Sequence, residues 1–227
     1  MRESFVLRMP ATLDAAASAP LLCAGVTTYS PLRHWKAGPG TRVGVVGLGG
    51  LGQMAVKIAR AMGATVTVIT TSKEKSAHAL KLGASKVVMS ENKDEMKAAE
   101  ASLDLILSTI PEAHDPNPYI ALLAREGVYT IVGCLTPLKV PLDMSKMNPD
   151  RKSVGSTLIG GIKETQEALD FFAAHNIVSD IKLIPIDDVN AAFKAVDEGK
   201  ADFRYVIDMA TLKGKKEDDS IAAKVGL

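Results

Sequence analysis

Three glycines in this chain have the spacing G-x-G-x-x-G: Gly47, Gly49 and Gly52. They follow a short run of β-branched apolar residues and precede a segment whose apolar residues recur at helical spacing. Glycine permits a sharp turn out of a strand, a close approach of the backbone to an anion, and close packing of a helix on a sheet. The first N–H groups of such a helix, together with its dipole, bind a pyrophosphate. We therefore expect a dinucleotide site, rather than a plain turn of another α/β protein, built from Gly47, Leu48, Gly49, Gly50, Leu51 and Gly52.

The residues about 20 positions beyond these glycines indicate which dinucleotide is bound. An NAD site usually carries Asp or Glu there to hold the ribose 2′-hydroxyl. This chain instead has hydroxyl side chains at Thr70, Thr71 and Ser72, and Lys75 follows. Hydroxyls and an ammonium would bind a 2′-phosphate, and one charge-assisted contact contributes about 1.5–3 kcal/mol. The sequence favours NADP; the alternative is that Lys73 and Lys75 are solvated helix residues.

The segments around these residues alternate between strands and helices. Short apolar runs predict strands over 43–46, 66–69, 86–89, 103–107, 127–132 and 154–159, with helices over 71–82, 92–99 and 118–124 between them. This alternation implies parallel pairing and right-handed crossovers, hence an α/β fold with a doubly wound parallel sheet of the Rossmann type. Ligands of such sheets bind at the carboxyl ends of the strands. Gly47, Thr70, Thr109 and Gly133 all follow predicted strands, so we expect them at one rim.

The flanking segments carry weaker patterns. Residues 5–7 predict a short strand, and Thr12 is a candidate N-cap for a helix that follows it. Beyond the sheet, 164–174 predicts an amphipathic helix, and 181–186, 189–196 and 203–207 predict a strand, a helix and a strand. Residues 213–227 alternate charge without an apolar face and predict a flexible tail.

Composition excludes several classes of function. The chain of 227 residues has 27 basic and 26 acidic residues, a net charge of +1, so no electrostatic field favours nucleic acid or an anionic membrane. No apolar run reaches the length of a membrane span. Two cysteines cannot form a disulfide framework, which fits a reducing compartment. We expect a cytoplasmic protein without nucleic-acid or membrane partners.

Three segments together resemble one enzyme family. CAGVTTYSP (23–31), GLGGLG with TTSKEK, and GSTLIGGIKET (155–165) are similar to the zinc-dependent medium-chain alcohol dehydrogenases, specifically the cinnamyl alcohol dehydrogenase-like group. The similarity runs in order from about residue 5 to residue 208. It implies reversible hydride transfer between NADPH and a small aldehyde or alcohol, with zinc polarising the carbonyl oxygen as a Lewis acid. It also makes a homodimer through the sheet edge near 154–159 plausible.

The resemblance also assigns residues. Cys23 matches a cysteine that binds the catalytic zinc, and Thr27 matches a residue beside the cofactor. The remaining matches lie along the path from adenosine to nicotinamide: Thr109, Gly133, Ser156, Thr157 and Leu158.

The zinc ligands of that family are otherwise missing here. The only cysteines are Cys23 and Cys134, the four histidines are scattered, and a catalytic zinc needs three protein ligands. We therefore expect a truncated form or fragment: residues 1–20 as a remnant of a GroES-like catalytic domain, 21–175 as the NADP-binding domain, 176–210 as a return to the catalytic domain, and 211–227 as a tail. The alternative is a non-catalytic NADP-binding module, with a methyltransferase more distant, and with Cys23 a small buried apolar residue. His114 is expected to be a solvated loop histidine rather than a substrate contact.

Overall fold

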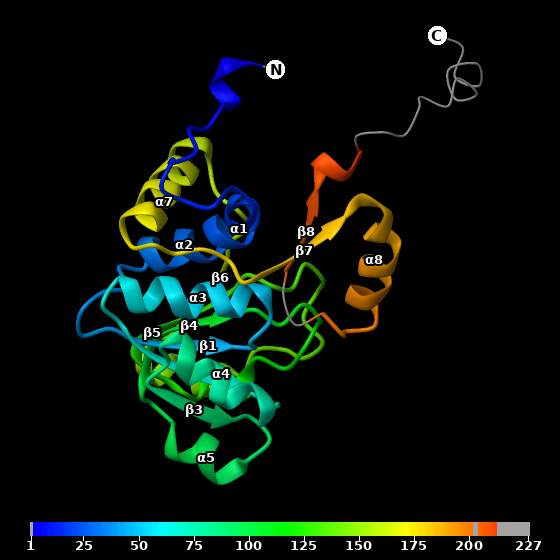
Figure 1. Cartoon of the computed structure of the whole chain (residues 1–227). Coiled ribbons are helices and arrows are strands. Elements are labelled where there is room, and N and C mark those ends of the chain that lie inside the picture. The colour runs from blue at the N-terminus through cyan, green and yellow to red at the C-terminus, as the bar shows by residue number, and fades with distance from the viewer. Residues whose placement is uncertain (1, 202–203, 213–227) are drawn as a thin grey trace.

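The computed structural model describes residues 2–201 and 204–212 of the chain (Figure 1). Its main sheet is formed by β1 (Arg42–Val46), β2 (Thr65–Thr70), β3 (Lys86–Met89), β4 (Leu103–Ser108), β5 (Leu123–Ile131) and β6 (Ser153–Ser156). The strand order is β3-β2-β1-β4-β5-β6, and every neighbouring pair is parallel. The chain builds the sheet outward from β1 in one direction, then returns to β4 on the other side of β1. This confirms the predicted doubly wound Rossmann sheet.

Helices cover both faces of this sheet. The α-helices are α1 (Ala15–Ser18), α2 (Ala24–His34), α3 (Gly50–Ala61), α4 (Glu74–Leu82), α5 (Lys93–Ala98), α6 (Asn117–Ile120), α7 (Ile162–Ala174) and α8 (Val189–Asp197). Short 3₁₀ turns occupy Glu3–Phe5, Ala19–Leu22, Met144–Lys146, Asn148–Asp150, Ile186–Asp188 and Met209–Leu212. No helix among these residues is both long and apolar enough to cross a membrane.

The alternation of side chains along each strand divides the core in two. Val43 and Val45 of β1 pack into the cluster that also contains Met54 and Ile58 of α3. Val46 packs instead into the cluster on the opposite face, with residues from β4, β5 and α6. Because both faces are buried, the strands are apolar along nearly their whole length, as parallel strands usually are.

A second, smaller unit follows α7. β7 (Ile181–Pro185) and β8 (Arg204–Asp208) pair in parallel and are connected through α8. Figure 1 shows this unit, in orange, beside the main sheet. The predicted strand, helix and strand are therefore confirmed. Residues 211–212 of the predicted tail belong to the turn Met209–Leu212, and residues 213–227 lie outside the described part.

Two predictions at the amino-terminal end are wrong. Residues 5–7 form no strand; Glu3–Phe5 is a 3₁₀ turn, and Phe5 and Val6 are 61% and 62% exposed, without a strand beside them in the described part of the chain. Thr12 is not the N-cap of α1. The Asp14 carboxylate takes that role by accepting a hydrogen bond from the N–H of Ala17 at 2.7 Å.

Three predicted boundaries move within the sheet region. α6 ends at Ile120 rather than at 124, because the chain from Leu123 already pairs with β4. β6 ends at Ser156 rather than at 159, since Ile159 has a φ of 49° and cannot extend a strand. α4 begins at Glu74 rather than at Thr71, which leaves the hydroxyl residues after β2 in a loop.

Candidate dinucleotide-binding site

A pocket of about 880 Å³ lies at the carboxyl rim, at the ends of β1 and β4. These are the two strands between which the strand order reverses, and ligands of doubly wound sheets bind at that point. Ten predicted cofactor residues line the pocket: Gly47, Leu48, Gly49, Gly50, Leu51, Thr70, Thr71, Ser72, Lys75 and Thr109.

The glycine turn has the geometry that its spacing predicts. Gly47 has a φ of 88°, a left-handed conformation that L side chains rarely adopt, so the chain can leave β1 sharply. A Cβ on Gly49 would meet nothing within 4 Å, so the backbone is open to an approaching ligand. A Cβ on Gly52 would lie 2.2 Å from the carbonyl oxygen of Gly47. Gly52 itself does not line the pocket; it sets how closely α3 packs on the strand.

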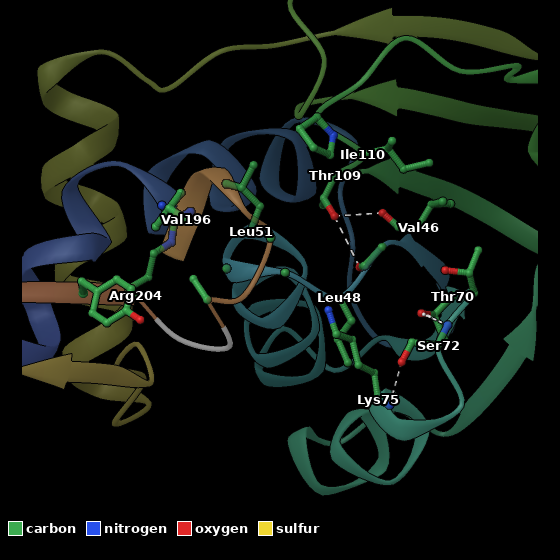
Figure 2. Close-up of a pocket in the computed structure, with 18 of the residues that line it drawn as sticks. Val46, Leu48, Leu51, Thr70, Ser72, Lys75, Thr109, Ile110, Val196 and Arg204 are labelled. Carbon is green, nitrogen blue, oxygen red and sulfur yellow. Dashed lines mark hydrogen bonds between the residues drawn. The ribbon is translucent and has the colours of Figure 1, made fainter. Parts of the chain in front are cut away.

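Thr109 fixes the floor of the pocket. Its Oγ1 donates to the carbonyl oxygen of Val46 at 2.9 Å and lies 3.3 Å from that of Gly47, as the dashed lines in Figure 2 show. Gly133 lies directly behind it: a Cβ there would be 2.5 Å from the carbonyl carbon of Thr109. Gly133 therefore permits the close packing of this loop without lining the pocket.

The loop after β2 presents the hydroxyl residues. Thr70 Oγ1 accepts a hydrogen bond from the N–H of Ser72 at 3.2 Å. Ser72 Oγ accepts one from the N–H of Lys75 at 3.4 Å and donates one to a Glu74 carboxylate oxygen at 2.8 Å. Figure 2 shows Thr70, Ser72 and Lys75 together at one end of the pocket. This loop brings the hydroxyls of Thr70 and Ser72 and one ammonium to the same end.

Arg204 of β8 lies at the opposite end of the pocket (Figure 2). Its Nε is 2.2 Å from the position that a Cβ on Gly50 would occupy, so the guanidinium lies over the first turn of α3. The same Nε is buried and has no hydrogen-bond partner. A buried donor without a partner is costly, and an anion above the amino end of α3 would satisfy it.

Sequence reasoning missed Arg204 and the wall that accompanies it. The second unit contributes an apolar wall to the pocket: Ile184, Val189, Ala192, Phe193, Val196 and Ile207. No glycine spacing or hydroxyl cluster marks these residues; the one available signal is the arginine that begins the short strand Arg204–Asp208.

The end of the pocket near β3 is lined by an aromatic side chain, Tyr119. Tyr119 and Ser90 line the pocket, and burial raises the pKa of Tyr119, against a hydrogen bond with Ser90 that lowers it. The Tyr119 ring stacks on Tyr129 with 6.3 Å between centroids, and burial strongly raises the pKa of Tyr129. The His114 Nε2 lies 2.9 Å from the Tyr129 hydroxyl and 3.3 Å from Ser108 Oγ. The expectation of a solvated histidine is wrong, because His114 is half-buried in this network.

Besides Gly133, five residues that the family resemblance places beside the cofactor or zinc do not line the pocket: Cys23, Thr27, Ser156, Thr157 and Leu158. Thr27 is buried in α2. Ser156 ends β6, and Leu158, two residues beyond it, is 58% exposed. Cys23 precedes α2 and is exposed, so the alternative of a small buried apolar residue is wrong. The roles assigned to these residues stay predictions.

The described residues fit a dinucleotide and do not by themselves fit a zinc ion. The open backbone at Gly49, the unpartnered Arg204 Nε and the cationic loop after β2 suit a ligand with separated phosphates. Within residues 2–201 and 204–212, no group of three His, Cys, Asp or Glu side chains could hold a metal ion. Cys23 is a single ligand, and a catalytic zinc needs three from protein.

Comparison with known proteins identifies the family. The sequence profile described as zinc-binding dehydrogenase matches residues 50–174, and the chain belongs to that family. The chain is 49% identical over 214 residues to aldehyde reductase YahK of Escherichia coli (strain K12), a match that covers 93% of this chain and 61% of that protein. It thus spans about three fifths of the length of the curated relatives that it matches.

Two solved structures have the same fold over nearly the whole chain. A cinnamyl alcohol dehydrogenase from Sorghum bicolor has a TM-score of 0.89 and 41% identity, covering 96% of this chain and 61% of its own. The CAD protein from Helicobacter pylori, complexed with NADP(H), has a TM-score of 0.81 and 43% identity, covering 92% of this chain and 59% of its own.

Proposed function

We propose that this chain is the cofactor-binding part of an NADP-dependent alcohol dehydrogenase, or aldehyde reductase, of the zinc-dependent medium-chain type. One observation carries the proposal. A single pocket at the strand-order reversal joins a glycine turn, an arginine whose buried Nε has no partner, and a hydroxyl-rich loop with a lysine. The family membership and the NADP(H) complex of the Helicobacter pylori relative support it.

In this proposal each end of the pocket holds one phosphate-bearing part of NADP. The N–H groups at the start of α3 and the Arg204 guanidinium bind the pyrophosphate, because both direct donors to the same space above Gly50. Ser72 and Lys75 bind the 2′-phosphate. When bound, NADPH would supply a hydride from its nicotinamide ring, and the reaction's substrate would be a small alcohol or aldehyde. Thr27, Gly133 and residues 156–158 complete the cofactor path in this proposal.

Zinc belongs to the proposal only through Cys23. The exposed thiol is available to a metal in the complete enzyme, yet the described residues offer no second and third ligand around it. We therefore derive no catalytic step through zinc from this chain. This observation favours one alternative: a non-catalytic NADP-binding module, which needs no metal.

A binding experiment and an activity experiment separate these possibilities. Titration of the chain with NADPH by isothermal calorimetry should give binding at one site, weakened at least tenfold by Arg204→Gln. Absence of NADPH binding would contradict both readings. NADPH-dependent reduction of an aldehyde by the chain, with zinc found by metal analysis, would contradict the non-catalytic module.

We also propose the division of the chain at residues 20, 175 and 210, a cytoplasmic location, and a homodimer. Among the residues that the structure describes, β6 is an edge strand of the main sheet, which supports pairing with a second copy. Light scattering measures the association state, and a strict monomer at micromolar concentration would contradict the homodimer.

A further inference from the structure

The hydroxyl that should receive the 2′-phosphate already has an acceptor within the chain. Ser72 lines the pocket, and its Oγ donates to a carboxylate oxygen of Glu74 at 2.8 Å. The same Oγ accepts from the N–H of Lys75 at 3.4 Å. A serine hydroxyl has a single hydrogen to donate. While Glu74 accepts that hydrogen, Ser72 can offer a phosphate oxygen only lone pairs.

Glu74 holds this position as an ionised group. It is the first residue of α4 and is exposed, next to Lys73 and one residue before Lys75. The Ser72 hydrogen bond lowers the pKa of the Glu74 carboxyl, as do its own backbone N–H and the charge of Lys73. A carboxylate in the first turn of a helix is also favoured by the helix dipole. Its negative charge therefore persists near neutral pH, beside the group that would bind the phosphate.

The Ser72–Glu74 hydrogen bond and the charge of Glu74 both disfavour a 2′-phosphate, but neither disfavours a 2′-hydroxyl. A 2′-phosphate is an acceptor with a charge of about −1.5 to −2 near pH 7, so it competes for the Ser72 hydrogen and is repelled by the carboxylate. The 2′-hydroxyl of NAD carries no charge and can itself donate to a carboxylate oxygen. The loop thus contains one group for NADP, Lys75, and one against it, Glu74.

We propose that Glu74 is a specificity-determining residue that reduces the preference of this site for NADP over NAD. The inference rests on the proposed function, because it concerns the same cofactor site. It differs from the expectation drawn from the sequence, in which Thr70, Thr71, Ser72 and Lys75 act together and without opposition.

The test measures the dissociation constants of NADPH and NADH for the chain and for Glu74→Gln, which removes the charge at nearly constant shape. We expect the NADPH constant to fall about three- to tenfold, as when one exposed charged contact is released, while the NADH constant changes less than twofold. Glu100→Gln is the matched control. Glu100 is exposed between α5 and β4, at the amino end of the sheet and away from the pocket, so neither constant should change.

A second comparison separates the hydrogen bond from the charge. Glu74→Met, which removes the acceptor as well as the charge, should give a larger gain in NADPH affinity than Glu74→Gln, whose amide oxygen can still accept the Ser72 hydrogen. In a Ser72→Ala background the two changes should give the same gain, because no Ser72 hydroxyl is left to release. Thermal melting verifies that each variant is folded.

Three results would overturn the inference in distinguishable ways. An unchanged ratio of the two constants in Glu74→Gln would show that the carboxylate does not oppose the phosphate. Weaker NADPH binding would show that Glu74 supports the loop instead. If the unaltered chain bound neither nucleotide, the proposed function would fail, and this inference with it.

Discussion

In the glycine turn, the same Gly→Ala change should have different consequences at two positions: loss of stability at one and loss of cofactor binding at the other. Gly52→Ala should destabilise the fold, and Gly49→Ala should leave stability unchanged but weaken cofactor binding. The difference lies in the surroundings: a Cβ on Gly52 would lie 2.2 Å from the Gly47 carbonyl oxygen, whereas a Cβ on Gly49 would have nothing within 4 Å. Both changes add a single methyl group, so each is the control for the other.

The magnitude follows from two opposing terms. Gly52 is the third residue of α3, and alanine there gains about 1 kcal/mol of helix propensity. The contact it creates is with backbone, which cannot rotate away, so overpacking costs about 3 kcal/mol, the upper end of its usual range. The net loss is about 2 kcal/mol, equivalent to a fall in melting temperature of about 4–8 °C for a chain of this size.

Differential scanning calorimetry of the three proteins tests this. Gly49→Ala should melt within 1–2 °C of the unaltered chain, about the shift of a neutral surface change, yet bind NADPH at least tenfold more weakly. If Gly52→Ala melted at or above the unaltered chain, helix propensity would outweigh the backbone contact. That result would contradict the claim that α3 packs too closely on the end of β1 to accept a Cβ at Gly52.

Two further predictions concern charged groups. Lys75→Ala should raise the NADPH dissociation constant about tenfold to a hundredfold, as expected for one charge-assisted contact, and change that of NADH less than twofold. Calorimetric titration measures both constants, and equal losses of affinity for the two nucleotides would contradict the assignment of Lys75 to the 2′-phosphate. Between β1 and β4, Asp104 accepts from Arg42 at 2.5 and 3.0 Å, and this hydrogen bonding lowers the pKa of Asp104 below its usual 3.8. A lowered pKa stabilises the fold fully above pH 3.8, so Asp104→Asn should reduce the melting temperature at pH 7, and the difference should disappear as the pH falls below 3.8. Because the two side chains are 46% and 37% exposed, the loss at pH 7 should be about 1 kcal/mol or less, and a difference that grew in acid would refute the argument.

The site illustrates which features a sequence carries and which it does not. The turn from Gly47 to Gly52 was predictable because each glycine is required by its immediate surroundings. Gly47 has a positive φ, Gly49 leaves the backbone open, and Gly52 lets the helix pack closely. The hydroxyl loop was predictable in composition, but its conformation was not. Helical periodicity suggested a helix from residue 71, whereas the bond from the Ser72 N–H to Thr70 keeps the loop open until Glu74. The competition between Glu74 and the phosphate depends on that conformation.

The far wall of the pocket depends on contacts between distant segments. Arg204 lies more than 150 residues beyond Gly50, and no spacing relates the two. Their proximity arises because the second unit returns along the rim of the main sheet. The same reasoning explains His114: its Nδ1 lies 2.9 Å from the Glu112 carbonyl oxygen of its own loop, but the partners of its Nε2, Tyr129 and Ser108, come from neighbouring parallel strands.

The most direct test of the account is phosphorus NMR of NADP bound to this chain, recorded as a function of pH. A free phosphate monoester changes charge near pH 6, and its resonance moves accordingly. If the 2′-phosphate lies against Ser72 and Lys75, its bound resonance should stay at the dianion position well below pH 6, and Lys75→Ala should restore the titration. A bound cofactor whose 2′-phosphate titrates as it does free in solution would contradict the central claim.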